Sequence, residues 1–405
     1  MTQNIRLGIV RETKVPIDRR VPLTPKQARL LLERYNNIEI YVQPSKERCY
    51  SDAEYQDLDI NLREDLSNCD ILMGVKEINL STLISGKTYY FFSHISKKQE
   101  YNRILLQRII KEKISLVDYE HLTNKKNIRL VAFGFWAGIV GSYNGLIGWG
   151  LRTGKYKIKP ANNCRDMKEM FHELANIDLG NIKILVSGGG RVAHGAIKTL
   201  NSMNLKAVSP NDFLNKTFDE AVYTQIDPDS YVERIDGKKF DLQHFFNNPT
   251  EYKSSFLPFT KVTDIFIACH FWDKESPVFM TNNEMNLSDF KIQLIADVSC
   301  DIAKPIPSTL RASTINNPFY GYNPDTGLET EAFGSDKIIT VMAVDNLPAE
   351  LPRDASADFG DKLMSELFPA IFGKDEDDLI ERATIVKEGK LTEKYSYLQN
   401  FADGK

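Results

Sequence analysis

The sequence predicts an α/β protein of two doubly wound domains, each with a largely parallel sheet, and a cleft between the domains. Three observations lead to this class. Apolar runs of strand length alternate with segments of helical spacing along nearly the whole chain, which favours parallel sheets covered by helices on both faces. The 405 residues exceed one ordinary hydrophobic core, so two domains are expected. The hydrophobic fraction of 42% and the charged fraction of 26% are those of a globular protein.

The first part of the chain contains the clearest alternation. Thr24 is suited to cap a helix that begins at Pro25, and Ser51 is suited to cap the next helix. A third helical pattern covers residues 99–113. We expect strands at residues 5–10, 38–43, 69–76, 87–94 and 114–120. The third of these strands ends in a lysine, the fourth in a histidine and the fifth in acids.

The second part begins with residues 131–151, whose small residues and glycines are typical of a closely packed helix that joins two domains. A strand, a glycine turn and a helix follow over residues 183–203. Residues 345–372 predict a helix start and then a long amphipathic helix. The polar segment 211–260 is interpreted as an irregular insertion. Further strands are expected at residues 205–209, 261–272 and 290–300.

Composition and charge exclude several classes of partner. A formal net charge of −4 and a pI near 6.0 give no electrostatic reason to expect binding to nucleic acid or to an anionic membrane. The five cysteines form no CxxC pair, which disfavours a zinc site or a disulfide framework and suits a reducing cytoplasm. No signal peptide is recognised, and no apolar run reaches the roughly 18 residues of a membrane span. We therefore expect a cytoplasmic protein with small-molecule partners and no metal.

The turn "SGGGRVAHGA" has the spacing of a dinucleotide-binding fingerprint, with a strand before it and a helix after it. Gly188 permits the tight turn, and Gly190 lets the backbone approach a pyrophosphate, with Arg191 and Val192 opening the helix. The pyrophosphate would lie on free N–H groups at the positive end of the helix dipole. Ala193 and Gly195 are expected to keep the helix close to the strand. The turn predicts a Rossmann-like cofactor domain; the alternative is a connection that binds nothing.

The identity of the dinucleotide is less clear from the next strand, residues 205–209. An NAD site normally has an acid at the end of that strand to bind the ribose 2′-OH. Here the strand ends on Ser209, whereas Lys206 and Arg191 are candidate partners for a 2′-phosphate. NADP(H) is therefore modestly preferred over NAD(H). The alternative is that Asp212, slightly later in the chain, reaches the ribose.

Two strands are expected to end on residues that can transfer protons. "GVKE" contains Lys76, and "FSHI" contains His94. Ligand crevices in open α/β sheets lie at the carboxyl ends of the strands. Histidine titrates near neutral pH, and burial can lower the pKa of a lysine. Each residue also has an ordinary interpretation: Lys76 as a solvated strand end, and His94 as a core histidine bonded to a backbone carbonyl.

Motifs spread over nearly the whole chain resemble the lysine-forming saccharopine dehydrogenase family. The resemblance is strongest to the lysine–ketoglutarate reductase half of the bifunctional aminoadipic semialdehyde synthases, and alanine dehydrogenase and the soluble transhydrogenase domain are more distant. The matching segments are "RRVPLTPKQ", "GVKE", "TYYFFSHISKKQEYN", "VDYEHL", "RLVAFGFWAGIVG", "SGGGRVAHGA", "ADVSCD" and "VDNLPAELPRDAS".

By position, this resemblance implies that Lys76 and His94 are the acid–base pair. It further implies that Glu77 and Glu120 tune the charge around that pair. In the implied reaction L-lysine condenses reversibly with 2-oxoglutarate, and NAD(P)H reduces the imine to saccharopine. The attacking amine must be neutral and the carbinolamine oxygen must be protonated before it leaves, so both a base and an acid are needed.

The same resemblance places further residues around substrate and cofactor. Arg20 and Arg129 match positions near substrate carboxylates, which arginine forks bind bidentately. Asp345 matches a residue that faces nicotinamide and substrate. Asp297 and Ser299 match a loop beside the cofactor.

The resemblance also implies the domain organisation. Residues 1–135 with 335–405 would form the substrate domain, and residues 136–334 the dinucleotide-binding domain. Bifunctional members of the family carry a second, saccharopine-oxidising half, so we expect a separate enzyme to supply that step; oligomerisation is open. Two alternatives remain: an alanine-dehydrogenase-like or other amino-acid dehydrogenase with a drifted substrate, and a non-catalytic nucleotide-binding sensor.

Overall fold

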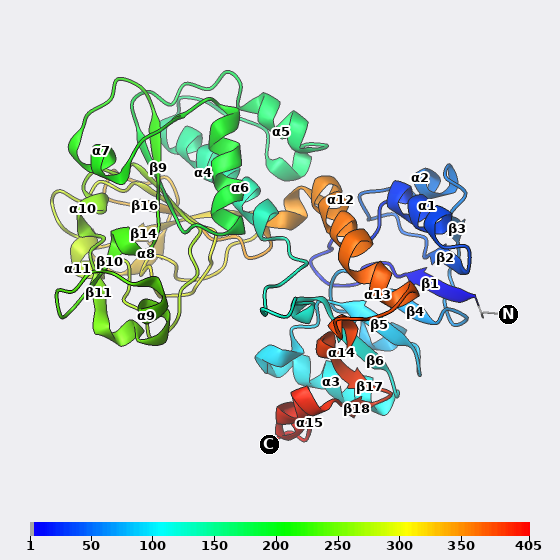
Figure 1. Cartoon of the computed structure of the whole chain (residues 1–405). Helices are drawn as coiled ribbons and strands as arrows, with labels where there is room; N and C mark the ends of the chain where they lie inside the picture. The colour runs from blue at the N-terminus through cyan, green and yellow to red at the C-terminus, as the bar shows by residue number, and fades with distance from the viewer. Residues whose placement is uncertain (1–3) are drawn as a thin grey trace. The chain divides into compact units, whose positions relative to one another are not determined.

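The computed structural model describes residues 4–405, which form two compact units. The first unit contains the described residues up to Phe133 together with Pro352–Lys405, and the second is Gly134–Leu351. In Figure 1 the first unit is the blue-to-cyan part of the chain together with the part from orange α12 to the red C-terminus. The chain returns to the first unit at Pro352 and not near residue 335, because strand β16 (Ile339–Met342) pairs within the second unit's sheet.

The first unit is built on one eight-stranded sheet in the order β18-β17-β6-β5-β4-β1-β2-β3. Strands β1 to β6 pair in parallel, and β17 and β18 are antiparallel additions at one edge. The strands are β1 (Ile5–Ile9), β2 (Ile38–Val42), β3 (Asn61–Leu62), β4 (Ile71–Met73), β5 (Thr88–Phe91), β6 (Ser115–Asp118), β17 (Thr384–Lys387) and β18 (Lys390–Leu391).

Helices cover both faces of this sheet, as predicted. Thr24 and Ser51 form the predicted N-caps of α1 and α2, each with a capping box. The α-helices are α1 (Pro25–Arg34), α2 (Asp52–Gln56), α3 (Glu100–Lys111), α12 (Pro352–Lys362), α13 (Phe368–Phe372), α14 (Leu379–Ala383) and α15 (Gln399–Ala402). Short helical turns are η1 (Leu80–Thr82), η2 (Ile95–Lys97), η3 (Tyr119–His121) and η8 (Glu393–Leu398), and a π-helical turn, η7 (Leu363–Leu367), lies between α12 and α13.

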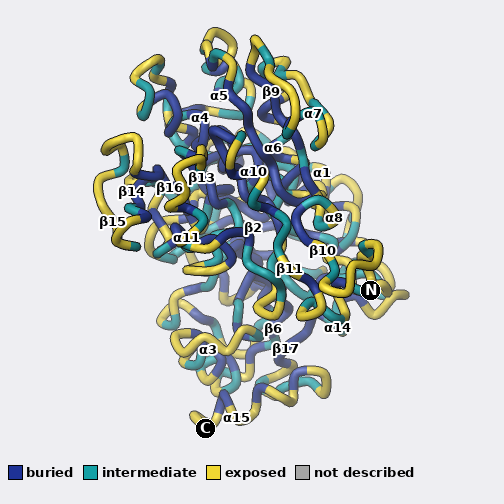
Figure 2. The backbone as a smooth tube through the Cα atoms, turned by 90° about the vertical axis from the view of Figure 1, so that its left-hand side faces the viewer, coloured by how far each residue is buried: buried dark blue, intermediate teal, exposed yellow. Residues whose placement is uncertain are grey.

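The aromatic run of β5 divides its side chains between two hydrophobic cores. Tyr89 and Phe91 pack in one core, with α3 and the C-terminal segment. Tyr90 and Phe92 pack in the other, with residues of α1 and α12. This alternation is the period-two pattern of a strand with both faces buried, and it fixes the register of the strand that leads to His94. Buried residues, dark blue in Figure 2, follow the strands, and exposed yellow residues mark the turns.

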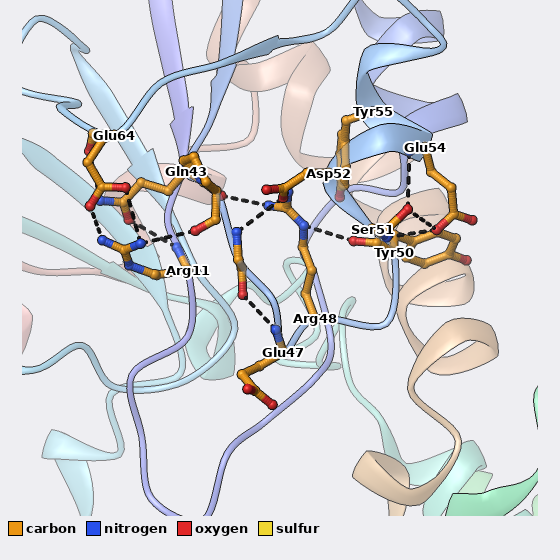
Figure 3. Close-up of polar contacts among 12 residues, drawn as sticks. Arg11, Gln43, Glu47, Arg48, Tyr50, Ser51, Asp52, Glu54, Tyr55 and Glu64 are labelled. Atoms are coloured by element: carbon orange, nitrogen blue, oxygen red, sulfur yellow. Dashed lines mark hydrogen bonds and ion pairs between the residues drawn. The ribbon is translucent and has the colours of Figure 1, made fainter.

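Polar contacts hold the loop between β2 and α2 (Figure 3). Arg48 donates to the carbonyl oxygens of Gln43 and Tyr50 and pairs with Asp52. Its guanidinium also lies 4.6 Å from the centroid of the Tyr55 ring. The buried cation thus satisfies backbone groups that a loop without regular structure leaves unpaired.

The second unit also has an eight-stranded sheet, in the order β15-β14-β16-β13-β12-β7-β9-β8. Six strands pair in parallel, and β14 and β15 are antiparallel at one edge. The strands are β7 (Lys183–Ser187), β8 (Lys206–Ala207), β9 (Val222–Ile226), β12 (Ile265–Ala268), β13 (Leu294–Asp297), β14 (Phe319–Asn323), β15 (Leu328–Thr330) and β16; a separate hairpin pairs β10 (Val232–Arg234) with β11 (Tyr252–Ser254).

The glycine-rich segment forms the predicted long helix, α4 (Gly134–Thr153), which packs against α6 (Arg191–Ser202) (Figure 1). A Cβ atom on Gly195 would lie 1.9 Å from the carbonyl oxygen of Phe135. Gly195 therefore permits close packing of two helices, and not of helix against strand as predicted. The other helices are α5 (Met167–Glu173), α7 (Pro210–Asn215), α8 (Pro228–Tyr231), α9 (Leu242–Asn247), α10 (Leu257–Thr260) and α11 (Asn282–Met285), with short turns η4 (Ala161–Asn163), η5 (Pro249–Glu251) and η6 (Leu347–Glu350).

The interpretation of residues 211–260 as an irregular insertion is wrong in one respect. Strand β9 lies within this segment, is mostly buried, and pairs directly with β7. In its sequence, "VYTQI", the alternation of apolar and polar residues is too weak for the strand to be recognised between the polar segments on either side. The strand that follows α6 in the chain, β8, is instead displaced to the edge of the sheet.

Candidate functional site

In the first unit, four neighbouring strands bring their carboxyl ends to one edge. Beyond Met73 the chain stays paired, since Gly74 donates to the carbonyl of Tyr90, and Phe92 donates to the carbonyl of Val75. Strand β1 runs between β2 and β4, so the sheet changes its winding direction there. Crevices of open α/β sheets form at such a switch point.

Lys76 lies in the loop after β4, because the strand ends at Met73 and not at the lysine as predicted. A carboxyl group that sequence reasoning missed, that of Glu12, holds this loop. Its oxygens accept hydrogen bonds from the backbone N–H groups of Val75 at 2.6 Å and Lys76 at 2.9 Å. Burial, and then the nearby Arg20 guanidinium, lower the pKa of Lys76 below its usual range. A lysine so placed loses its proton more readily than a solvated one.

His94 follows β5 by three residues, since the strand ends at Phe91. Its backbone is left-handed, with φ of 54°, which turns the chain sharply out of the sheet. Asp118 at the end of β6 fixes the turn by accepting from the backbone N–H and the hydroxyl of Ser93. The imidazole stacks on Phe92, and its Nδ1 lies 3.4 Å from Oε2 of Glu120. His94 is thus anchored by the end of its own strand and by residues at and after the end of β6.

Glu120, beside His94, also contacts two further basic side chains. Its Oε1 accepts from Nη2 of Arg129 at 2.7 Å and lies 3.7 Å from Nζ of Lys97. Burial opposes ionisation, but the hydrogen bond to His94 and the charges of Lys97 and Arg129 outweigh it and lower the pKa of Glu120 to about 2. Glu120 is therefore an anion at neutral pH, paired with three potential cations.

A second charged group lies beside Lys76. Arg20 is buried and binds Asp18 through Nε at 2.9 Å and Nη2 at 2.5 Å, while its guanidinium lies 4.1 Å from the ring centroid of Phe133. Against the effect of burial, this guanidinium holds the pKa of the Asp18 carboxyl well below its usual range. Asp18 was missed in the sequence, although it stands two residues before Arg20.

Glu77, which follows Lys76 directly in the chain, is the remaining charged residue of this region. Its Oε2 accepts from Nζ of Lys14 at 2.8 Å. Its Oε1 is buried, and no residue in the described part of the chain hydrogen-bonds it. Lys76, Glu77, His94, Glu120 and Arg129 thus follow neighbouring strand ends on one charged edge of the first unit, and the buried Arg20 acts on Lys76 through its charge.

In the second unit the glycine turn opens a cavity of about 780 Å³ at the switch point between β7 and β12. Its lining includes Gly188 to Val192, the residues that follow β9 and the residues that follow β12. A Cβ atom on Gly188 would lie 2.8 Å from the carbonyl oxygen of Cys269, so this position tolerates no side chain. A Cβ atom on Gly190, in contrast, would meet nothing within 4 Å. That open space over the first turn of α6 is where a pyrophosphate fits, so these residues suit a dinucleotide.

Of the residues considered for the ribose or its phosphate, Arg191 lines this cavity, whereas Lys206, Ser209 and Asp212 do not. Ser209 caps α7 by accepting from the N–H of Asp212, and Lys206 pairs with Glu220. They belong to β8 and its continuation, which β9 separates from β7. Asp227 follows β9 directly and lines the cavity. The sequence signal "TQIDP" was present, but recognising it required knowing which strand pairs with β7.

Three predicted residues lie at the same carboxyl edge of the second sheet. Asp297 ends β13 and is buried, and it accepts from the hydroxyl groups of Ser299 and Thr309, both at 2.6 Å. The backbone N–H of Ser299 donates to the carbonyl of Ala268 on β12, next to the cavity. Asp345 is exposed three residues after β16.

In residues 4–405, no group of three or more His, Cys, Asp or Glu side chains could hold a metal ion. No helix within this range has the length and apolar character needed to cross a membrane.

The fold defines the class of protein. Two solved structures align with nearly the whole chain: an L-alanine dehydrogenase, with a TM-score of 0.66, 13% identity and 99% of both chains covered, and a transhydrogenase from Sinorhizobium meliloti, with a TM-score of 0.58, 14% identity and 96% and 98% covered. A family model described as alanine dehydrogenase/PNT, N-terminal domain, matches residues 8–140. The chain therefore has the two-domain, Rossmann-type fold of these dehydrogenases.

Relatives that match in sequence indicate more closely which kind of dehydrogenase the chain resembles. An alpha-aminoadipic semialdehyde synthase of Arabidopsis thaliana is 29% identical over 97% of this chain, and the mitochondrial enzyme of Rattus norvegicus is 27% identical over 98%. The chain spans 41% and 48% of their lengths. A saccharopine dehydrogenase [NAD(+), L-lysine-forming] of Schizosaccharomyces pombe is 26% identical over 88% of this chain and 90% of its own length. The predicted resemblance to the lysine-forming saccharopine dehydrogenases is thereby confirmed, and the Schizosaccharomyces pombe relative is an NAD(+)-dependent dehydrogenase by name.

Proposed function

We propose that this chain catalyses the reversible reductive condensation of L-lysine with 2-oxoglutarate to saccharopine. The observation that carries the proposal is the edge of the first unit, where a lysine of lowered pKa and a carboxylate-paired histidine follow adjacent strands. The names of the relatives support the same reaction. An imine-forming reaction needs two proton-transfer groups, and this edge supplies two of different kind.

In the proposed reaction Lys76 acts as the base. Burial and the Arg20 charge favour its neutral form, which can take a proton from the substrate ammonium and free the amine to attack the keto carbon. Glu12 holds the Lys76 backbone and so fixes the origin of the side chain. His94 is the acid that protonates the carbinolamine oxygen so that water leaves. Its Nδ1 is engaged by Glu120, which leaves Nε2 for the substrate.

The substrates carry three carboxylates, and the edge supplies cations for them. Arg129 and Lys97 are both about half exposed while they contact Glu120, so they can attract carboxylates without losing that anchor. Arg20 is fully buried against Asp18. We propose that Arg20 acts mainly by lowering the pKa of Lys76, and that a direct contact with a substrate carboxylate is its secondary role.

The cofactor is a nicotinamide dinucleotide held by Gly188, Gly190, Arg191 and Val192, and it supplies the hydride when bound. We propose NAD(H), in contrast to the NADP(H) preference that the 205–209 strand suggested. Asp227 occupies the position after the strand adjacent to β7, where an acid binds a ribose 2′-OH and repels a 2′-phosphate. Asp297, Ser299 and Asp345 are proposed to line the nicotinamide side of the same edge.

The proposal is tested by the loss of reduced-cofactor absorbance with purified protein, lysine and 2-oxoglutarate, each omitted in turn. NADH and NADPH are compared, and ornithine, pyruvate and ammonia serve as alternative substrates. Oxidation that requires both lysine and 2-oxoglutarate, faster with NADH, is the expected result. Oxidation with ammonia and pyruvate but without lysine would instead support an alanine dehydrogenase, and cofactor binding without any turnover would support a sensor. The cytoplasmic location, a separate saccharopine-oxidising enzyme and an oligomer stay predictions.

A further inference from the structure

One buried side chain, that of Asp118, joins the main chain beside His94 to the main chain of Glu120. Its Oδ2 accepts from the backbone N–H of Ser93 at 3.1 Å and from the Ser93 hydroxyl. Its Oδ1 accepts from the backbone N–H of Glu120 at 2.8 Å. Asp118 ends β6, which pairs in parallel with β5, and Figure 1 shows the two strands side by side. The residue before His94 and Glu120 itself are therefore fixed to the same carboxyl group.

The backbone of His94 has a conformation that its neighbours must maintain. Its φ of 54° lies in the left-handed region, which residues with a side chain adopt rarely. The Ser93 hydroxyl accepts from the N–H of Ile95 at 3.3 Å, and Asn102 donates to the carbonyl oxygen of His94 at 3.2 Å. Such a conformation persists only where surrounding groups hold it, and it is frequent at functional sites. The contact between Asp118 and Ser93 thus helps to keep the imidazole beside Glu120.

Burial makes this contact specific. Asp118 and Ser93 are both fully buried. A buried carboxyl group is tolerated when donors satisfy its oxygens, and all three side-chain hydrogen bonds described for Asp118 come from Ser93 or Glu120. The carboxyl group in turn satisfies two backbone N–H groups at the ends of their strands. Loss of one of these bonds therefore acts directly on the two segments that carry the His94–Glu120 pair.

Other ionisable groups around this contact leave the Asp118 charge in place. The groups that face His94 or Asp118 are Lys97 on η2, Tyr119, Glu120 and His121 on η3, Arg129 after η3, and Tyr395 on η8. Burial raises the pKa of both tyrosine hydroxyls and lowers that of His121 below its ordinary 6.5. These three side chains are thus uncharged near neutral pH, and a change at Ser93 alters none of the charges.

We propose that Asp118 is a positioning residue for the acid step, which acts through the Ser93 hydroxyl and the Glu120 main chain to set the contact between Nδ1 of His94 and Glu120. The inference rests on the proposed function, in which His94 is the acid, and deepens it. Because Asp118 is fully buried, it acts through these neighbours and not on the substrate. When the contact is lost, His94 relaxes away from Glu120, and the imidazolium that the acid step requires is less favoured.

Ser93→Ala tests the proposal without changing any charge. The variant removes the hydroxyl between Asp118 and the N–H of Ile95, while both carboxyl groups stay. We expect kcat to fall about 10- to 100-fold, since a small displacement of a reacting group has effects of this size. The alkaline limb of the kcat profile should move to lower pH. Asp118→Asn, which replaces one acceptor oxygen by a donor, should move the limb in the same direction.

The double variant Ser93→Ala/Glu120→Gln tells whether the effect passes through Glu120. Its alkaline limb should coincide with that of Glu120→Gln alone, because the charge that Asp118 positions is absent. Steady-state kinetics of the full chain across pH measures each limb. Nitrogen-15 NMR of the histidine rings measures the same contact without turnover, with His94 assigned by the signal that is missing in His94→Gln. Ser93→Ala should shift the Nδ1 signal of His94, as Glu120→Gln does.

Asp264→Asn is the matched control. Asp264 is also buried and accepts from the backbone N–H of Lys183 at 2.8 Å, but it precedes β12 at the amino end of the second unit's sheet. This variant should leave both the alkaline limb and the His94 signal unchanged.

Four outcomes decide the proposal. A limb and an Nδ1 signal that coincide with wild type in Ser93→Ala would overturn it. Additive limb shifts in the double variant would overturn it too, since the effect would not depend on Glu120. So would an equal change in Asp264→Asn, which would reflect the loss of any buried carboxyl group. Wild-type protein without lysine-dependent turnover would contradict the proposed reaction alone, because the Nδ1 signal still tests the positioning.

Discussion

The sheets of the two units have nearly the same strand arrangement, but the residues at their carboxyl edges are very different. In each, a first strand has two parallel strands on one side and three on the other, and an antiparallel pair completes the far edge. At the carboxyl edge of the first unit lie ionisable residues in contact with one another. At the carboxyl edge of the second lie a glycine turn and an aromatic cavity. The architecture supplies the position of a site, and the residues after the strands decide what the site can do.

The position after the first strand of each sheet illustrates this difference. After β1 the chain places Glu12, a buried carboxyl that holds the Lys76 loop. After β7 it places Gly188, where no side chain would fit. The first edge is therefore suited to proton transfer, and the second to a phosphate-bearing cofactor. If this division of work is correct, substitutions in the two units should affect different measured quantities.

The largest expected effect is that of Lys76→Met on turnover. Removal of the proposed base should lower kcat about 10²- to 10⁴-fold, because general base catalysis contributes that much. The dissociation constant for NADH should stay within about twofold of wild type, since the cofactor residues belong to the other unit. Stopped-flow turnover and NADH fluorescence titration measure the two quantities. Normal turnover would remove Lys76 from the mechanism, and a large loss of NADH affinity would break the comparison between the units.

Gly190→Val should have the opposite profile. Gly190 has extended backbone that any residue adopts, so the variant should fold, but its side chain would fill the open space over α6. We expect NADH affinity to fall by about 100-fold or more, since the pyrophosphate loses its place at the helix terminus. Calorimetry with NADH checks the affinity, and thermal melting controls for folding. Unchanged NADH binding would contradict the assignment of the turn.

Glu120→Gln should have a smaller effect that appears in the pH profile. The variant keeps the shape of the side chain but removes the negative charge 3.4 Å from Nδ1 of His94. The imidazolium form, which the proposed acid step requires, is then less favoured, so the alkaline limb of the kcat profile should move to lower pH. We expect kcat at its optimum to fall about tenfold. A pH profile that coincides with wild type would show that Glu120 does not act through His94.

The smallest effect is expected away from both edges, at Glu350 in the second unit. Burial raises the pKa of Glu350 from 4.5 to about 8, and Asn144 donates a hydrogen bond to it at 2.8 Å. Between these two pH values the folded chain keeps a proton that the unfolded chain has released, so the free energy of unfolding falls as pH rises through this window.

In Glu350→Gln the side chain is neutral at every pH, so the free energy of unfolding should fall less as pH rises. Near pH 8.5 we expect its Tm to exceed that of wild type by about 2–4 °C, which corresponds to roughly 1 kcal/mol in a unit of this size. The difference should vanish only below the unfolded-state pKa of 4.5, where the wild-type carboxyl is protonated in both states. Calorimetric melting from about pH 3.5 to pH 8.5 measures it; parallel Tm curves for variant and wild type would contradict the assignment. Burial also raises the pKa of Glu12 to about 8. Because both proteins contain Glu12, its contribution to the pH dependence of stability is the same in variant and wild type.

The sequence predicted the alternation of strands and helices, the caps at Thr24 and Ser51, and the fingerprint at Gly188, because local spacing determines each of them. It did not predict that β9 lies beside β7, since pairing order is set by long-range packing. The proposed ribose residue therefore changed from Ser209 or Asp212 to Asp227. Nor did spacing indicate Glu12, whose role arises only when β1 and β4 are adjacent.

The chemistry at Lys76 and His94 is the central claim, and the product of the reaction tests it most directly. Purified protein is incubated with lysine, 2-oxoglutarate and NADH deuterated at the transferable position, and the products are analysed by mass spectrometry. The account predicts a secondary amine that joins the two carbon skeletons and carries one deuterium at the former keto carbon. Absence of the joined product from lysine, with deuterated glutamate formed instead when ammonia replaces lysine, would contradict it.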